Sequence, residues 1–545
     1  MESSKKTSFI KGAAILTVAG LICKVIGVLI RIFAVRTIFE DGMYFYEKVF
    51  PTYSWLLIIS SSGIPTAISR MVAERAAVGN YDGARRVFRR SLLLLLLIGT
   101  VTSAFMFFGA KWIGTELLSA KDGIEYSLMA LAPALLFVSL LCAYRGYLQG
   151  LQRMTGTSVS QLAEQVFKFI FGLILASFLF RKFAGTAYQY AAGAAGLLLG
   201  VTISEVLALL VMIVFYMRTR KQYTALIEDP DPHAKILRPM LMIAVPITLG
   251  ASILPLANML DSSMIEQLLL KAGFTKEYAA LSYTSLCTYV RSIINLPATL
   301  TVGIAMSIVP AISAARIRQD HSDVQHLSLL SLKIAMAIGI PCAVGLSVLA
   351  GPIIKFLYMR GDAKFFDALA IAEPLMHVAA FTVIFISLVQ TATGALQGAG
   401  KHWLPMIFLL IGGVTKIAVN LIFIPMREIN ILGAVFSNLA CFGVAGILDT
   451  IALLRVTKAR LNVLDTFLKP IAASALMGGA AWGVQWLLSR VPFLQGGVTS
   501  RIVTLVSILV AVATYAIFTI LFAMFTKDEL AYIPGGRKLA RFARR

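Results

Sequence analysis

The chain has 545 residues, of which 58% are hydrophobic and only 14% are charged. Soluble domains carry about 25% charged residues, so this composition excludes an ordinary soluble protein. Apolar runs of about 20 residues or more recur along the chain without polar alternation, which favours a polytopic helical membrane protein and excludes a β-barrel. The net charge of +22 does not indicate nucleic-acid binding, because the excess lysine and arginine lies in short loops and the C-terminal tail, as membrane topology predicts.

Taken in chain order, the apolar runs predict an all-α fold of fourteen membrane spans. The predicted spans are 11–39, 51–73, 87–110, 124–150, 157–180, 188–217, 236–270, 279–315, 327–358, 368–400, 402–425, 431–454, 467–488 and 502–525. The first of these is too long and too cationic for a cleaved signal peptide. With these spans, 27 Lys/Arg residues fall on one side of the membrane and 13 on the other. The excess predicts that both termini are cytoplasmic, which agrees with an even number of spans.

Two short motifs occur twice, which predicts an internal repeat. Residues 146–150 (Gly-Tyr-Leu-Gln-Gly) recur 248 positions later as 394–398 (Gly-Ala-Leu-Gln-Gly), and at the same offset Lys168 falls on Lys416. The Pro-x-Ala-Ile-Ser sequence that begins at Pro65 is echoed by the Pro-Ala-Ile-Ser sequence that begins at Pro310. Each copy holds about six spans, so the copies share one orientation and relate by an axis along the membrane normal.

The repeat sets the expected domain organisation. It predicts an N-terminal lobe over 1–220 and a C-terminal lobe over 221–456, followed by two added helices over 457–526 and a basic cytoplasmic tail over 527–545. Transporters built from such repeats bind their substrate between the lobes and rock them to expose it to either side.

Apart from the 27 and 13 cations assigned to the two sides, nine sit inside apolar segments that are long enough to cross a membrane: Lys24, Arg31, Arg36, Arg70, Arg145, Lys168, Arg291, Lys333 and Lys416. A cation at the bilayer centre costs about 2.5–3.5 kcal/mol on insertion scales, and such residues mark polar cavities and ion or substrate paths. The set therefore predicts a transporter of an anionic substrate.

The nine positions differ in how strongly they indicate binding. Lys24 and Arg31 lie seven residues apart on one helix face and are deep in the first span. Arg291, near Pro297, and Lys416, with no acid one turn away, are the other strong candidates. Arg70, Arg145 and Lys168 remain open between binding and a structural role. For Lys168 that role would be pairing with Glu164, four residues earlier. Arg36 and Lys333 are interpreted as anchors at the membrane surface.

Nothing in the sequence indicates catalysis, a cofactor or a bound metal. The five cysteines and five histidines are scattered, without metal-ligand spacing, and no Gly-rich loop matches a nucleotide site. Transport would then draw on an ion gradient, the membrane potential or the substrate gradient. Among the acids within spans, Asp261, with Asn258 one turn earlier, is the candidate for sodium or proton coupling.

The motifs resemble those of bacterial polysaccharide-biosynthesis flippases. The resemblance is carried by Lys24, Arg31, the Gly-Ile-Pro-Thr-Ala-Ile-Ser-Arg run that ends at Arg70, the Arg-Gly-Tyr-Leu-Gln-Gly run that begins at Arg145, and the Val-Pro-Ala-Ile-Ser run around Pro310. It covers nearly the whole chain and extends to the stage V sporulation protein B group, the lipid II flippases and the superfamily that contains the MATE multidrug exporters.

This resemblance implies two six-helix lobes around a cationic cavity in the bacterial cytoplasmic membrane. An undecaprenyl-pyrophosphate-linked sugar, such as a peptidoglycan precursor, would pass between the lobes by alternating access. In that family, cations of helices 1, 2 and 8 contact the headgroup, and Lys24 and Arg291 match such positions. A sodium site proposed in the family would draw here on Asp261 and Asn420. The alternative is a multidrug or cation antiporter of the MATE type, whose cavity should be acidic or aromatic.

Overall fold

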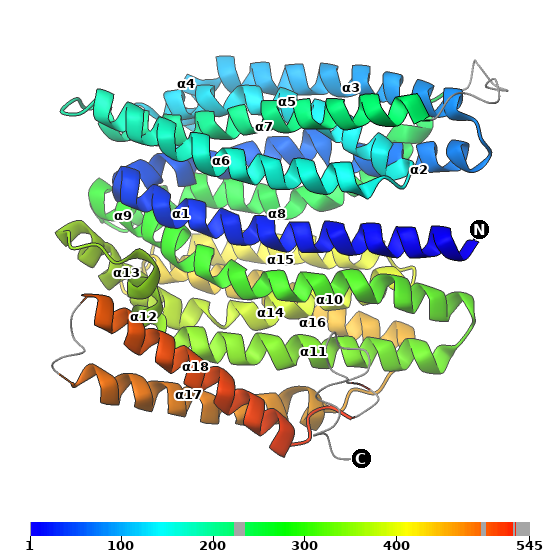
Figure 1. The fold of residues 1–545 in the computed structure, drawn as a ribbon. Coiled ribbons are helices and arrows are strands. Elements are labelled where there is room, and N and C mark those ends of the chain that lie inside the picture. Colours follow the sequence, from blue (N-terminus) through cyan, green and yellow to red (C-terminus); the bar gives the residue numbers. More distant parts are fainter. Residues whose placement is uncertain (1, 223–234, 492–496, 527–528, 530–545) are drawn as a thin grey trace. The chain divides into compact units, whose positions relative to one another are not determined.

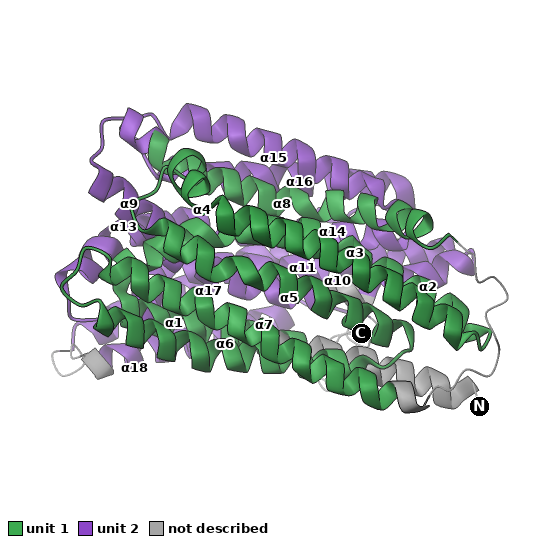
Figure 2. Ribbon diagram, turned by 90° about the horizontal axis from the view of Figure 1, so that it is seen from above, with its two compact units in different colours: residues 1–267 green, residues 268–545 purple. Residues whose placement is uncertain are grey.

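The computed structural model describes residues 2–222, 235–491, 497–526 and 529, and all regular structure within them is helical (Figure 1). The predicted cytoplasmic tail, 527–545, therefore lies outside the described residues except for Glu529. The chain divides into two compact units, Met1–Gln267 and Leu268–Arg545, shown in separate colours in Figure 2. Each unit is considered by itself.

The first unit contains seven helices of fifteen residues or more and two short segments. They are α1 (Glu2–Ser61), α2 (Gly63–Ala77), α3 (Tyr81–Phe108), α4 (Ala110–Trp112), η1 (Ile113–Leu117), α5 (Ile124–Gly150), α6 (Met154–Lys182), α7 (Gln189–Gln222) and α8 (Leu237–Lys271), whose last turn passes the unit boundary. Asparagine at the N-cap of α3 accepts a hydrogen bond from the backbone of Gly83, a typical helix start. In Figure 1, α3, α5, α6 and α7 run side by side.

The second unit repeats this arrangement and adds two helices. It contains α9 (Lys276–Ser285), η2 (Leu286–Arg291), α10 (Ser292–Ile317), α11 (His321–Val348), α12 (Ala350–Tyr358), α13 (Ala363–Ala379), α14 (Thr382–Gly398), α15 (Trp403–Phe423), α16 (Leu432–Thr457), η3 (Leu464–Leu468), α17 (Lys469–Ser489) and α18 (Gly497–Leu521). The added helices, α17 and α18, pack against each other and lie beside α11 (Figure 1).

Length and hydropathy mark a multi-pass membrane protein. Eleven helices of the described residues can cross a membrane, or twelve if the bent pair α13 and α14 forms one span. The span predicted at 124–150 coincides with α5, and the others fall on helices with shifted ends. The two predicted spans not included in that count, 11–39 and 51–73, fall on α1 and α2.

The segment between the first two predicted spans is helical, which corrects the expectation of an outer loop over 40–50. Backbone angles of φ 59° and ψ −175° at Phe39 break α1 into two arms, and the helix resumes at once and continues to Ser61. A positive φ is strained for a residue with a bulky side chain. The ring of Phe39 lies 5.9 Å from that of Phe180 on α6, which helps hold the break in place. The second arm therefore brings Tyr46, Lys48 and Phe50 into the helix bundle.

Two other predicted spans are interrupted. The expected single helix over 327–358 breaks at Leu349, between α11 and α12. The expected helix over 368–400 bends by 48° between α13 and α14. Helix-period hydrophobicity persists through such breaks, so it does not reveal them.

The sequence repeat corresponds to the same helix pairings in both units. In the first, α5 contacts α2, α3 and α7, while α6 contacts α7; in the second, α14 contacts α10, α11 and α16, while α15 contacts α16. The duplicated glycines explain the central pairing. A Cβ at Gly150 would lie 2.7 Å from the carbonyl oxygen of Ser69 on α2, and one at Gly398 would lie 2.9 Å from that of Val309 on α10. Each Gly-x-x-x-Gly motif thus lets two helix backbones approach closely.

Candidate functional site

Two contacts fix how the first arm of α1 is aligned along the length of α6. The Cys23 thiol donates to the Gln161 carbonyl oxygen over 3.5 Å, and ten residues further along, Phe33 packs edge-on against Phe169, with ring centres 5.6 Å apart. The two helices therefore run in the same direction. This register places Arg31 and Lys168 at nearly the same level.

Both of these cations lie over aromatic rings of the second arm of α1. The Arg31 guanidinium is 5.9 Å from the ring centre of Tyr46, and the Lys168 ammonium is 5.2 Å from that of Phe50. The two rings stack on each other, with centres 5.2 Å apart. We call Arg31, Lys168, Tyr46 and Phe50 the cation–aromatic cluster. Arg31 also forms an ion pair with Glu47 at 2.9 Å.

Arg145, at the end of α5, is held by α6. Its guanidinium donates to Glu164 Oε2 at 2.9 Å and to Ser160 Oγ at 3.1 Å. The sequence left open a pairing of Lys168 with Glu164, one turn away; this pairing is wrong, because Glu164 is turned toward Arg145 on the neighbouring helix. The structure therefore places Arg145 in a structural ion pair and leaves Lys168 with the ring of Phe50.

The other candidate cations of the first unit, Lys24, Arg70 and Arg36, lie at its surface. Lys24 is exposed. Arg70 is exposed and pairs with Glu74 one turn on, at 2.9 Å. Arg36 is also exposed, as an anchor would be. The structure therefore gathers Arg31, Arg145 and Lys168 and leaves Arg70 apart.

In the second unit, Arg291 and Lys416 occupy different helices. Arg291 is half-buried and ends η2, a π-helical turn between α9 and α10. Such turns are rare and are frequent at functional sites. Pro297, which drew attention to Arg291 in the sequence, lies further along on α10; the π-helical turn itself left no recognisable signal in the sequence. Lys416, on α15, is 1% exposed, and Asn420 one turn on is fully buried.

The proposed coupling residues come from both units. Asp261 is 1% exposed and Asn258 is half-buried, both on α8 of the first unit, whereas Asn420 belongs to the second. Whether they form one ion site stays a prediction. In the second unit, Asp449 is also buried and accepts a hydrogen bond from Thr393 at 3.1 Å. Across the described residues, no group of three His, Cys, Asp or Glu side chains has the arrangement of a metal site.

Sequence reasoning missed Lys48, whose side chain is fully buried. Its ammonium donates to Glu266 at 2.7 Å, to the carbonyl oxygen of Ser262 at 2.7 Å and to that of Leu118 at 3.3 Å. Tyr44 donates to the same Glu266 carboxylate at 2.9 Å. The residue escaped notice because it fell in the expected loop, where a lysine is unremarkable.

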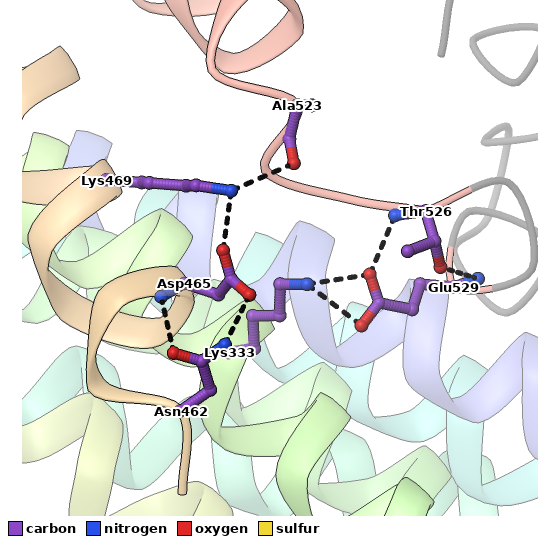
Figure 3. Close-up of polar contacts among 7 residues, drawn as sticks. All are labelled: Lys333, Asn462, Asp465, Lys469, Ala523, Thr526 and Glu529. Atoms are coloured by element: carbon purple, nitrogen blue, oxygen red, sulfur yellow. Dashed lines mark hydrogen bonds and ion pairs between the residues drawn. The ribbon is translucent and has the colours of Figure 1, made fainter. Parts of the chain in front are cut away.

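Lys333 also differs from its interpretation as a membrane-surface anchor. It is 9% exposed, and its ammonium contacts both oxygens of Glu529, at 2.9 and 2.7 Å (Figure 3). Glu529 and Thr526 exchange hydrogen bonds in a capping box, which orients the carboxylate. Lys469, nearby in Figure 3, pairs with Asp465 and donates to the carbonyl oxygen of Ala523. Lys333 thus fastens the chain after α18 to α11.

Comparison with known proteins agrees with this architecture. The curated lipid II flippase MurJ of Bacillus subtilis (strain 168) is 23% identical over 526 residues, which cover 93% of this chain and 94% of MurJ. The stage V sporulation protein B of the same organism is 24% identical over 531 residues, covering 97% and 98%. These relatives are thus matched over nearly their whole length.

Solved structures share the fold. The lipid II flippase MurJ in an inward closed conformation superposes with a TM-score of 0.64 at 16% identity, covering 93% of this chain and 98% of that one. An inward-facing multidrug resistance MATE transporter of the MOP superfamily gives 0.64 at 15% identity, covering 80% and 95%. The MatE family matches residues 278–422, and the polysaccharide biosynthesis protein family matches residues 9–315, more than half of the chain. The chain therefore belongs to the polysaccharide biosynthesis protein family, and its fold is that of the MurJ and MATE structures.

Proposed function

We propose that this protein is a flippase for an undecaprenyl-pyrophosphate-linked saccharide, such as a peptidoglycan precursor, and not an enzyme. It would work by alternating access in the bacterial cytoplasmic membrane, with both termini in the cytoplasm. Family membership and the flippase relatives support a transporter of this kind. The substrate class rests on the cations within the spans, because a pyrophosphate headgroup binds through charge-assisted hydrogen bonds.

Lys168 is the observation that carries this proposal. Across the described residues, its ammonium makes no hydrogen bond or ion pair, and its recorded contact is the ring of Phe50. An ammonium inside a membrane span is costly unless it binds something. Its three N–H groups, like the Arg31 guanidinium of the same cation–aromatic cluster, are suited to a phosphate. Lys24 on α1 would supply a further donor in the first unit; in the second unit, Arg291 and Lys416 stay predicted headgroup ligands.

The test is transport of lipid II by the purified protein in vesicles. Lys24→Ala and Lys168→Ala should each lower the initial rate at least about tenfold, a loss of about 1.4 kcal/mol of binding or transition-state free energy. Lys111→Ala is the matched control, since Lys111 is exposed on α4. Normal transport by both variants would reject the headgroup site, whereas no transport of any lipid-linked sugar by the wild type would reject the function.

A MATE-type antiporter is the second candidate, favoured by the MatE match over residues 278–422. Such a transporter exports organic cations, for which buried acids such as Glu205 and Asp449 would be suitable partners. Binding of ethidium, compared with binding of undecaprenyl pyrophosphate in the same nanodiscs, separates the two. Tight ethidium binding without pyrophosphate-lipid binding would select the antiporter.

A further inference from the structure

Glu205, on α7, is a buried acid with no role in the headgroup site. Its side chain is 6% exposed, and within the described residues its Oε2 has no hydrogen-bond partner. Buried carboxylates are normally hydrogen-bonded, and an ionised one without a donor is costly. In this conformation the neutral, protonated acid is therefore the favoured form.

The packing of α6 against α7 places Glu205 among charged groups. Gly172 and Gly200 meet where these antiparallel helices cross; a Cβ on Gly200 would lie 2.3 Å from the Cα of Gly172. Glu205 follows Gly200 along α7, and Lys168 precedes Gly172 along α6 by about the same number of residues. Because the two helices are antiparallel, Glu205 lies at the level of Lys168, about one turn from Glu164.

The neighbours of Glu205 come from three helices. The charged groups that act on it are Glu164 and Lys168 on α6 and Arg145 on α5. Tyr53 on α1 and Cys142 on α5 are further titratable side chains near Glu205. Of these, Arg145 is already paired with Glu164, whereas Lys168 has no acid as a hydrogen-bond partner among the described residues.

We propose that Glu205 is a proton-binding site of the first unit, and that the ionised Glu205 carboxylate competes with the anionic headgroup for the Lys168 ammonium. With Glu205 protonated, Lys168 is free to bind a phosphate. When Glu205 releases its proton to water, the new carboxylate attracts the Lys168 ammonium, and the phosphate loses a ligand. Proton and headgroup would then each raise the affinity for the other, since such coupling is reciprocal.

The bound ion is a proton rather than a metal cation, because no group of three potential metal-ligating side chains (His, Cys, Asp or Glu) occurs in the part of the chain that the structure describes. A proton needs only the carboxylate itself.

Protonation can be observed without transport. Infrared titration of the protein in nanodiscs should show a protonated carboxyl band that persists above the pH range in which exposed carboxyl groups titrate, which Glu205→Gln removes and the exposed-site control Glu116→Gln retains. Glutamine reproduces the shape of the protonated acid, so Glu205→Gln should fold. A wild-type spectrum without such a band, a band that survives in Glu205→Gln, or failure of that variant to fold at neutral pH would each overturn the proposal.

The coupling rests on the proposed flippase function and has its own measurement. Binding of undecaprenyl pyrophosphate to the wild type should weaken at least about tenfold as the pH rises through the range in which the Glu205 infrared band disappears, within the usual range of coupling. In Glu205→Gln and in Lys168→Met the affinity should change less than about twofold over the same pH range. The ionisation of the lipid probe itself also changes with pH, but its effect is the same for every variant and is subtracted. The same pH slope in all three proteins would overturn the coupling. An infrared band with no lipid binding would instead reject the flippase function and leave the proton site standing.

Discussion

The Lys48 ammonium and the Glu266 carboxylate form a buried ion pair 2.7 Å long that joins the second arm of α1 to the end of α8. The side chains are 0% and 6% exposed, and every Lys48 N–H has an acceptor among Glu266, Ser262 and Leu118. Such a network is stable only when it is complete, because removing one partner leaves an uncompensated charge. The pair therefore ties α8 to the first unit.

Lys48→Met should destabilise the protein by about 3–5 kcal/mol, the usual effect of breaking a buried pair from one side. The double variant Lys48→Met/Glu266→Gln should recover a large part of this loss, since it leaves no buried charge. Thermal unfolding of the purified protein in detergent measures both, with exposed Lys111→Met as the control. A double variant no more stable than Lys48→Met would contradict this account.

Sequence periodicity predicted the all-α membrane fold because apolar runs of span length have few other interpretations. The repeat also corresponds to structure: the glycines at 150 and 398 make the same close helix contact in the two units. The break at Phe39 could not be predicted, since it depends on a strained backbone at a residue that carries no turn signal.

The same limit applies to the candidate site. Residue spacing along a helix indicates local partners, such as Glu164 for Lys168. That Glu164 pairs with Arg145 instead depends on how α5 packs against α6. Lys48 and Lys333 were misjudged for a similar reason, since their acidic partners lie 218 and 196 positions away. A single sequence contains no signal of such distant pairs. The apolar runs therefore revealed which cations lie within the membrane spans, but not which acids pair with them.

The Lys333–Glu529 pair should stabilise the junction of α11 with the end of α18. Its side chains are 11% and 13% exposed, and the ammonium also lies 5.3 Å from the ring centre of Phe525. Lys333→Ala and Glu529→Ala should each lower stability by about 1–3 kcal/mol, and the double variant should lose little more than either. If thermal unfolding showed that the double variant loses as much stability as the two single variants together, the pair would contribute nothing to stability.

The close approach of α6 and α7 should tolerate no side chain at Gly200. A methyl group there would lie 2.3 Å from the Gly172 backbone, so Gly200→Ala should cost about 1–3 kcal/mol through overpacking. Gly479→Ala, on α17, is the matched control: nothing lies within 4 Å of its Cβ position, so alanine there should stabilise the helix by about 0.5–1 kcal/mol. Equal melting temperatures for the two variants would mean that the helices are not in contact at Gly200.

Topology can be tested with single cysteines in a background that lacks the five native ones. The Lys/Arg asymmetry predicts that Thr186→Cys and Asp362→Cys react with an impermeant reagent from outside, and that Val78→Cys does not. Gly42, an obvious probe from the sequence, is unsuitable, since a Cβ there would lie 2.6 Å from that of Ile38. Labelling of Val78→Cys in intact cells would reverse the predicted orientation.

Arg291 offers the sharpest test of headgroup chemistry in the second unit. It ends the π-helical turn η2, a rare backbone form that is frequent at functional sites. We expect Arg291→Ala to lower lipid II transport at least about tenfold, and Arg291→Lys to retain part of the rate, because lysine keeps the charge but loses the planar fork that grips two phosphate oxygens. Lys355→Ala, an exposed cation on α12, is the control. All variants should insert and unfold like the wild type, which detergent melting curves establish first. If Arg291→Ala then transported lipid II at the wild-type rate, Arg291 would be a structural residue of the π-helical turn, and the headgroup would have to be bound by other cations.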